Sequence, residues 1–210
     1  MTKKKDLITL FLINIPVVIL YYAVYRVPGV RPYANIAYFC LILITGGFLG
    51  REFLLKIEQQ KVKESKYLFF GVISMIFLYQ LMKFSSFIIS RNKNLQGIID
   101  LSLWQYFVRP WHEINILVSV SGVIIIVLAV EIFYRVYIQN TLNLYFKDNS
   151  AVFLASAISG ARAVTLGPVS GLVDFSLAYI WGFVYKKSGL WAAVFVHMVW
   201  DVLFVYFPAG

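Results

Sequence analysis

The chain alternates between long apolar runs and short polar connections. A helix needs about 20 mostly apolar residues to cross the hydrocarbon core of a bilayer. Seven segments come close to this length: 7–25, 33–50, 67–90, 114–134, 150–167, 168–185 and 189–207. The fifth and sixth are separated by "LGPVSG", where Gly167 suits a helix end and Pro168 a helix start. The pattern predicts an all-α, polytopic membrane protein with about seven transmembrane helices.

The composition supports this prediction. Of the 210 residues, 60% are hydrophobic and only 14% are charged, whereas soluble domains carry about 25% charged residues. The single cysteine, Cys40, excludes a disulfide framework. The two histidines, His112 and His197, are too few for most zinc sites, which take three or four protein ligands. We therefore predict no metal site and no cofactor.

The net charge of +9 does not indicate a nucleic-acid partner, because the basic residues are scattered between apolar segments. The lipid bilayer is the expected neighbour, and cytoplasmic loops carry the excess of Lys and Arg. With the N-terminus inside, twelve basic residues face the cytoplasm, five face outward, and Lys83 and Arg162 fall within spans. The five are Arg26, Arg31, Arg91, Lys93 and Arg109. We predict an integral protein of a prokaryotic plasma membrane, with a cytoplasmic N-terminus and an external C-terminus.

Ionisable residues within the spans are candidates for function, because burying a charge in a bilayer is costly unless it is paired. They are Lys83, Glu131, Arg162, Asp174, His197 and Asp201, with Arg135 at a span edge. His197 and Asp201 are four positions apart and share a helix face. Either both side chains line a polar site, or each has only a structural partner in the core. Arg162 stays charged and needs a carboxylate from Asp174, Asp201 or Glu131. Lys83 is close enough to a span end to extend to the boundary.

The stretch "AVEIFYR" (129–135) places Glu131 and Arg135 four residues apart in the last turn of the fourth span. Such a pair is either an ordinary contact at the membrane edge or part of a buried site.

Three blocks of sequence resemble the CPBP family of CAAX prenyl proteases and bacteriocin-processing or self-immunity proteins. They are "VEIFYR", "FLASAISGARAV" and "GFVYKKSGLWAAVFVHMVWD", within about residues 115–205. The resemblance implies a membrane-embedded helical core. We accordingly describe 1–210 as one integral membrane domain, with spans and amphipathic loops in 1–110 and a CPBP-like core in 111–210. The family pattern is Glu-Glu-x-x-x-Arg, then Phe-x-x-x-His, then a His followed four positions later by Asn or a similar residue.

The match to this pattern is incomplete. Glu131 corresponds to the second glutamate, Arg135 to the arginine and His197 to the last histidine, and Asp201 replaces the usual Asn. The first glutamate, which is taken as catalytic in the family, falls on Val130. Phe-x-x-x-His falls on Ser159 and Ala163, or on Gly160 and Val164 after a slip of one residue.

The resemblance implies that the first Glu and the middle His activate a water, directly or through a metal, and that the last His and Asn stabilise an oxyanion. Val130 and Ala163 offer no proton acceptor, and an ionised Asp201 only accepts hydrogen bonds. Glu131, about 100° around a helix from Val130, is expected to point away from the inherited site. His112 is predicted on the opposite side of the membrane from Glu131.

Three hypotheses follow. The first is a non-proteolytic protein that binds a membrane protein or membrane-anchored peptide as a scaffold, regulator or immunity-type factor, with Arg162 neutralised by Asp201 or Glu131. The second is an atypical intramembrane endopeptidase that uses Glu131, His197 and Asp201. The third is a transporter, channel or cofactor-binding subunit, which requires a continuous cavity beside its polar residues.

Overall fold

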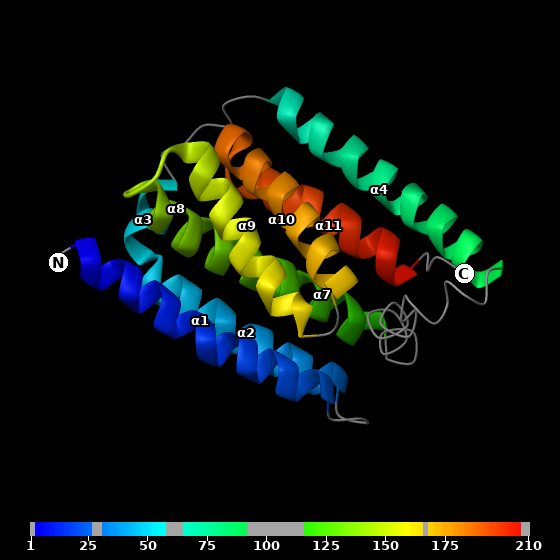
Figure 1. The fold of residues 1–210 in the computed structure, drawn as a ribbon, viewed down its shortest axis with the longest axis horizontal. Helices are drawn as coiled ribbons and strands as arrows, with labels where there is room; N and C mark the ends of the chain where they lie inside the picture. The colour runs from blue at the N-terminus through cyan, green and yellow to red at the C-terminus, as the bar shows by residue number, and fades with distance from the viewer. Residues whose placement is uncertain (1–2, 27–30, 58–64, 92–115, 166–167, 207–210) are drawn as a thin grey trace.

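The computed structural model describes residues 3–26, 31–57, 65–91, 116–165 and 168–206, and these residues are almost entirely helical. The helices are α1 (Lys3–Arg26), α2 (Arg31–Leu49), α3 (Arg51–Ile57), α4 (Ser65–Arg91), α7 (Ile116–Val130), the π-helix η1 (Glu131–Gln139), α8 (Asn140–Asn143), α9 (Asp148–Val164), α10 (Pro168–Ser188) and α11 (Leu190–Tyr206). The all-helical prediction is confirmed for the described residues, and each apolar segment matches one long helical stretch (Figure 1).

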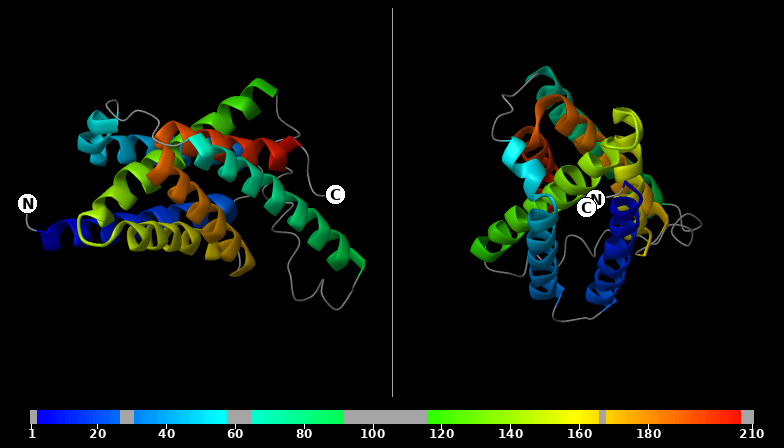
Figure 2. Two further views of the ribbon diagram at one scale, coloured as in Figure 1. Left: turned by 90° about the horizontal axis from the view of Figure 1, so that it is seen from above. Right: turned by 90° about the vertical axis from the view of Figure 1, so that its left-hand side faces the viewer.

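The long helices form a bundle around the C-terminal part of the chain. Figures 1 and 2 show α1 and α2 side by side on one flank and α4 on the opposite flank. The continuous stretch α7–η1 together with α9, α10 and α11 lies between these flanks, where α9 packs extensively on α10. The chain turns from α10 into α11 at Gly189, whose φ of +92° is a conformation that favours glycine.

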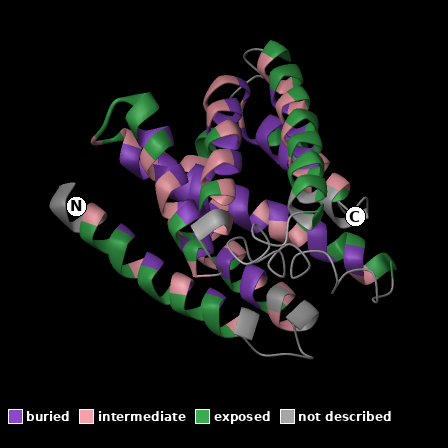
Figure 3. Cartoon of the chain, turned by 45° about the vertical axis from the view of Figure 1, so that its right-hand side comes forward, coloured by how far each residue is buried: buried purple, intermediate pink, exposed green. Residues whose placement is uncertain are grey.

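Among the described residues, three helical stretches have the length and hydropathy for a membrane crossing: Leu7–Val24, Ser65–Ser85 and Ile116–Asn143. The apolar helices Ile36–Leu49 and Leu190–Leu203 are shorter. Large apolar side chains on the flanking helices are exposed, as Phe11 on α1 and Phe77 on α4 are at 59% and 65%. Figure 3 shows that exposed residues recur along the outer helices. Such a surface suits lipid contact, so the chain is an integral membrane protein. The count of seven crossings stays a prediction.

The fourth segment differs from its predicted end at residue 134, because the helix continues through η1 and α8 to Asn143. The polar residues Arg135 and Gln139 lowered the apparent hydropathy of this part. Both side chains are 0% exposed, so they face protein rather than a membrane edge. The pair Glu131–Arg135 therefore lies inside the bundle.

Small residues allow α9 and α10 to approach closely. A Cβ added at Gly160 would lie 2.8 Å from the carbonyl oxygen of Gly171. Ser156 and Ser159, on the same helix as Gly160, are 0% exposed. This close crossing brings the polar side chains of α9 against α10.

Candidate functional site

His197 on α11 is held by groups from three helices. Its Nδ1–H donates to Glu131 Oε1 on η1 at 2.9 Å, since an ionised carboxylate only accepts. Its Nε2 lies 3.7 Å from Asp201 Oδ1, one turn further along α11. The indole of Trp181 on α10 stacks on the imidazole, with ring centroids 3.6 Å apart and planes at 14°. The imidazole is thus fixed in position between two carboxylates.

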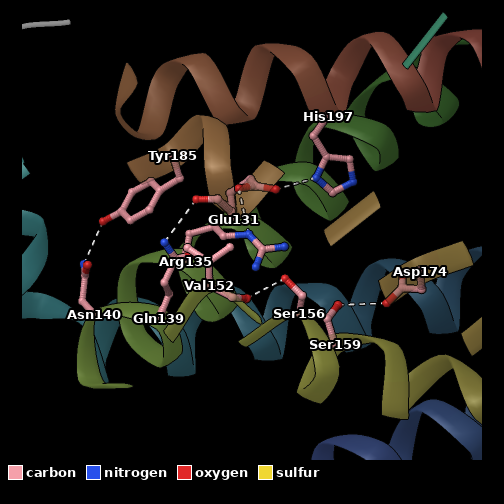
Figure 4. A network of polar contacts seen from close by, with 11 residues as sticks. Glu131, Arg135, Gln139, Asn140, Val152, Ser156, Ser159, Asp174, Tyr185 and His197 are labelled. Carbon is pink, nitrogen blue, oxygen red and sulfur yellow. Dashed lines mark hydrogen bonds and ion pairs between the residues drawn. The ribbon is translucent and has the colours of Figure 1, made fainter. Parts of the chain in front are cut away.

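Glu131 contacts Arg135 as well as His197 (Figure 4). Arg135 Nε lies 3.6 Å from Glu131 Oε2, and both side chains are 0% exposed. The π-helical turn begins at Glu131, and π-helical turns inside α-helices often occur at functional sites. A buried ion pair of this kind is a weak source of stability, but removing one partner leaves an uncompensated charge. The loss of either Glu131 or Arg135 is therefore expected to destabilise the protein through the charge that remains.

A second polar cluster lies where α9, α10 and α1 meet. Arg162 Nη2 lies 3.2 Å from Asp174 Oδ1, and the Ser159 hydroxyl donates to Asp174 Oδ2 at 2.9 Å. The Arg162 guanidinium also lies 4.8 Å from the Tyr21 ring centroid and 5.5 Å from that of Tyr134. Cation–π contacts of this length stabilise a desolvated guanidinium.

The partner of Arg162 corrects part of the first hypothesis, which assigned Asp201 or Glu131 to this role. Asp174 takes it instead, because α9 and α10 form an antiparallel pair that places residues 162 and 174 together. Asp201 and Glu131 both contact His197.

The orientation predicted for Glu131 was also wrong in one respect. Glu131 was expected to point away from the inherited site, yet it contacts His197, the best-matched residue of that site. The 100° step of an α-helix does not apply within η1, whose hydrogen bonds span one more residue.

The remaining motif positions are apolar or lie outside the described residues. Val130 and Ala163 are 3% and 1% exposed, in the protein interior. Lys83 is exposed, with its Nζ 5.4 Å from the Tyr79 ring centroid. His112 lies outside the described residues.

Sequence reasoning missed several polar residues that line the same interior. Gln139 is 0% exposed and donates to the Gly182 carbonyl on α10 at 3.2 Å. Asn140 donates to the Tyr185 hydroxyl at 2.7 Å. The sequence did contain a signal for Gln139. Glu131, Arg135 and Gln139 are spaced four positions apart, which places them on one helix face.

The donor set does not fit a metal ion. Within the described ranges, no group of three or more His, Cys, Asp or Glu side chains is placed to hold one. The Nδ1 of His197 is already engaged by Glu131, and Asp201 is the one other such side chain that contacts this imidazole among the described residues. We therefore derive no chemistry through a metal.

With the site defined, its relationship to known proteins can be stated. Residues 111–203, a little under half of the chain, match the family model described as type II CAAX prenyl endopeptidase Rce1-like. The match supports membership of the CPBP family of CAAX prenyl protease-like membrane proteins for this C-terminal part. No curated protein and no solved structure matches the chain.

Proposed function

We propose that this chain is a non-proteolytic, CAAX-protease-like membrane protein that binds another membrane protein or a membrane-anchored peptide. Its role is that of a scaffold, regulator or immunity-type factor. The observation that carries the proposal is the engagement of Glu131. Its carboxylate contacts both His197 and Arg135 in the interior, while Val130 holds the place of the family's first glutamate.

The chemistry of peptide hydrolysis supports the proposal. A general base must present a proton-accepting atom to a water, and both oxygens of Glu131 are directed at cationic or hydrogen-bond-donating side chains. An oxyanion needs donors. The Nε2 of His197 faces Asp201, whose ionised carboxylate would oppose a developing negative charge.

The family suggests the partner. Its description names a prenyl endopeptidase, which handles lipid-anchored peptides. A core that keeps the helices of such a protein but lacks its base retains a surface for anchored peptides without the means to cut them. A membrane-anchored peptide is therefore the partner class to test first.

The test combines cleavage and binding on the same purified protein in detergent. We expect no cleavage of farnesylated or transmembrane-anchored peptides above the level of Glu131→Ala and His197→Ala variants. We also expect measurable anisotropy changes with at least one labelled anchored peptide and none with the same peptide lacking its anchor. Cleavage that disappears in both variants would overturn the proposal, and so would the absence of any anchored-peptide binding.

One observation favours the endopeptidase as a second candidate function. The 2.9 Å contact between Glu131 and His197 joins a carboxylate and an imidazole from separate helices, which are the groups that an acid–base mechanism needs. The cleavage assay decides between the two candidates. The transporter hypothesis gains no support, because Glu131, Arg135 and Arg162 are buried in ion pairs.

We also infer that the protein lies in the plasma membrane of a prokaryote with its N-terminus in the cytoplasm. The excess of basic residues on one set of helix ends supports this orientation.

A further inference from the structure

The guanidinium of Arg135 lies in the interior of the bundle without a hydrogen bond. The side chain is 0% exposed, and none of its three nitrogens has a hydrogen-bond partner among the described residues. The contact from its Nε to Glu131 Oε2 is 3.6 Å long, whereas an N–H···O hydrogen bond spans about 2.7–3.2 Å. A buried donor without an acceptor raises the free energy of the folded state. Arg135 therefore needs acceptors in addition to Glu131.

A second buried arginine shows how protein side chains can stabilise such a group. The Nη2 of Arg162 donates to Asp174 Oδ1 at 3.2 Å. Its guanidinium also lies over the rings of Tyr21 and Tyr134, and an aromatic face attracts a desolvated cation. Within the part of the chain that the structure describes, no aromatic ring covers the Arg135 guanidinium in this way. The described side chains thus stabilise Arg162 more completely than Arg135.

Two oxygen atoms beside Arg135 lack donors in the same way. Glu131 Oε2 and Gln139 Oε1 are both buried, and neither accepts a hydrogen bond from the described residues. Gln139 Oε1 and Arg135 Nη1 lie 2.9 Å and 3.3 Å from the point that a Cβ at Gly182 would occupy, so they border the same small region. Glu131 Oε2 lies on the Nε side of the same guanidinium. The unsatisfied donors and the unsatisfied acceptors are therefore neighbours.

We propose that Arg135, Glu131 and Gln139 bind ordered water in the interior of the bundle. A water molecule accepts from the guanidinium and donates to Glu131 Oε2 or Gln139 Oε1, and buried waters typically make about three such hydrogen bonds. A carboxylate or a chloride ion would accept from the guanidinium but could donate to neither oxygen. It would also place a second negative charge beside Glu131. Water is thus the ligand that fits both kinds of atom.

Bound water accounts for an ionised pair in the interior of a membrane protein. Two charges removed from solvent need further hydrogen bonds in addition to their mutual attraction, and the water supplies them to Arg135 and Glu131. The water lies on the Oε2 side of the carboxylate, whereas His197 engages Oε1. The proposal is therefore independent of the proposed function, because it requires no partner and holds whether or not the protein cleaves peptides.

A crystal structure of the full chain in a lipidic mesophase, at a resolution that shows ordered water, tests the site directly. We expect a density peak within hydrogen-bond distance of an Arg135 nitrogen and of Glu131 Oε2 or Gln139 Oε1. The peak should be lost in Arg135→Met. It should remain in Tyr185→Phe, which removes the nearby contact with Asn140 instead. No peak in the wild type overturns the proposal, and so does an anomalous bromide peak at this position, which would show an anion site.

A second measurement uses the wild type in lipid bilayers. Water-edited solid-state NMR of the ¹⁵N-labelled chain detects N–H groups that lie beside water. We expect a water signal at the Arg135 Nε–H, assigned by its loss in Arg135→Lys. The matched controls are the backbone amides of Val136 and Ile138, which belong to the same helix and are also 0% exposed, and they should give none. A missing signal at Arg135 would show a dry ion pair, and equal signals at all three residues would show general hydration of the helix. Either result contradicts the proposal.

Discussion

Glu131 lies between an imidazole and a guanidinium, and its side chain is fully buried. The spacing of four residues was enough to predict the contact with Arg135. No local pattern predicts the contact with His197, which is 66 residues away along the chain. Both contacts affect the stability of the fold, because each buried charge has lost its hydration and is stabilised only by its neighbours.

A double-mutant cycle tests this dependence. Glu131→Gln leaves Arg135 buried without a counter-charge and should destabilise the fold by about 3–5 kcal/mol. Arg135→Met should cost less, because Glu131 keeps its hydrogen bond from His197. The double variant should be more stable than the sum of the single effects indicates. Unfolding of the purified protein, followed by circular dichroism in a detergent–denaturant titration, measures all three. Strictly additive effects would show that the two side chains are not energetically coupled.

Arg162 shows how far sequence reasoning reaches at a single residue. A permanently charged side chain within a span must have a carboxylate nearby, and that requirement was met. Three carboxylates were available, however, and choosing between them required the antiparallel packing of α9 on α10. The tyrosines over the guanidinium were not predicted at all, because Tyr21 and Tyr134 lie on elements far apart in the sequence.

Among the elements, the helix through Glu131 was the hardest to delimit. Hydropathy treats Arg135 and Gln139 as signals of water, and it therefore ends the span at residue 134. The residues from Phe133 to Gln139 are all buried, so this part of the helix is surrounded by protein. A helix surrounded by other helices can carry polar residues in its interior, and its apolar pattern then underestimates its length.

The crossing of α2 and η1 depends on a glycine. A Cβ at Gly46 would lie 2.9 Å from the Cα of Phe133, a backbone atom that cannot turn aside, whereas a Cβ at Gly47 meets nothing within 4 Å. Gly46→Ala should therefore destabilise the protein by about 1–3 kcal/mol through overpacking. Gly47→Ala should be neutral or stabilising by up to about 1 kcal/mol. Thermal unfolding in detergent compares the two variants directly, and an equal response would rule out a tight crossing at Gly46.

For the molecule as a whole, the apolar pattern located each long helix of the described residues, but it did not give the arrangement of these helices. The bundle depends on contacts between helices distant in sequence, such as α2 with η1 and α4 with α11. Several basic residues nevertheless lie at helix ends on one side of the bundle. The starts of α1, α4 and α9 and the turn from α10 to α11 lie toward the same side of the bundle (Figure 1), and they carry Lys66, Lys147, Lys186 and Lys187.

This asymmetry leads to a topology prediction that single cysteines can test. After replacement of Cys40 by Ala, Lys147→Cys should react with a membrane-impermeant maleimide only in permeabilised bacterial cells. Arg91→Cys should react in intact cells, because the side with fewer basic residues faces outward. Labelling of Lys147→Cys in intact cells would reverse the orientation.

Thr165, at the end of α9, decides the number of crossings. If α9 and α10 each cross the bilayer, Thr165→Cys should be labelled in intact cells. If they form a re-entrant hairpin, the cysteine stays within the membrane and reacts on neither side, although α11 still carries the C-terminus outside. A reporter fused after Gly210 cannot distinguish these two arrangements. The cysteine at position 165 can, because the tight α9–α10 contact at Gly160 and Gly171 exists in both and only the depth of the turn differs.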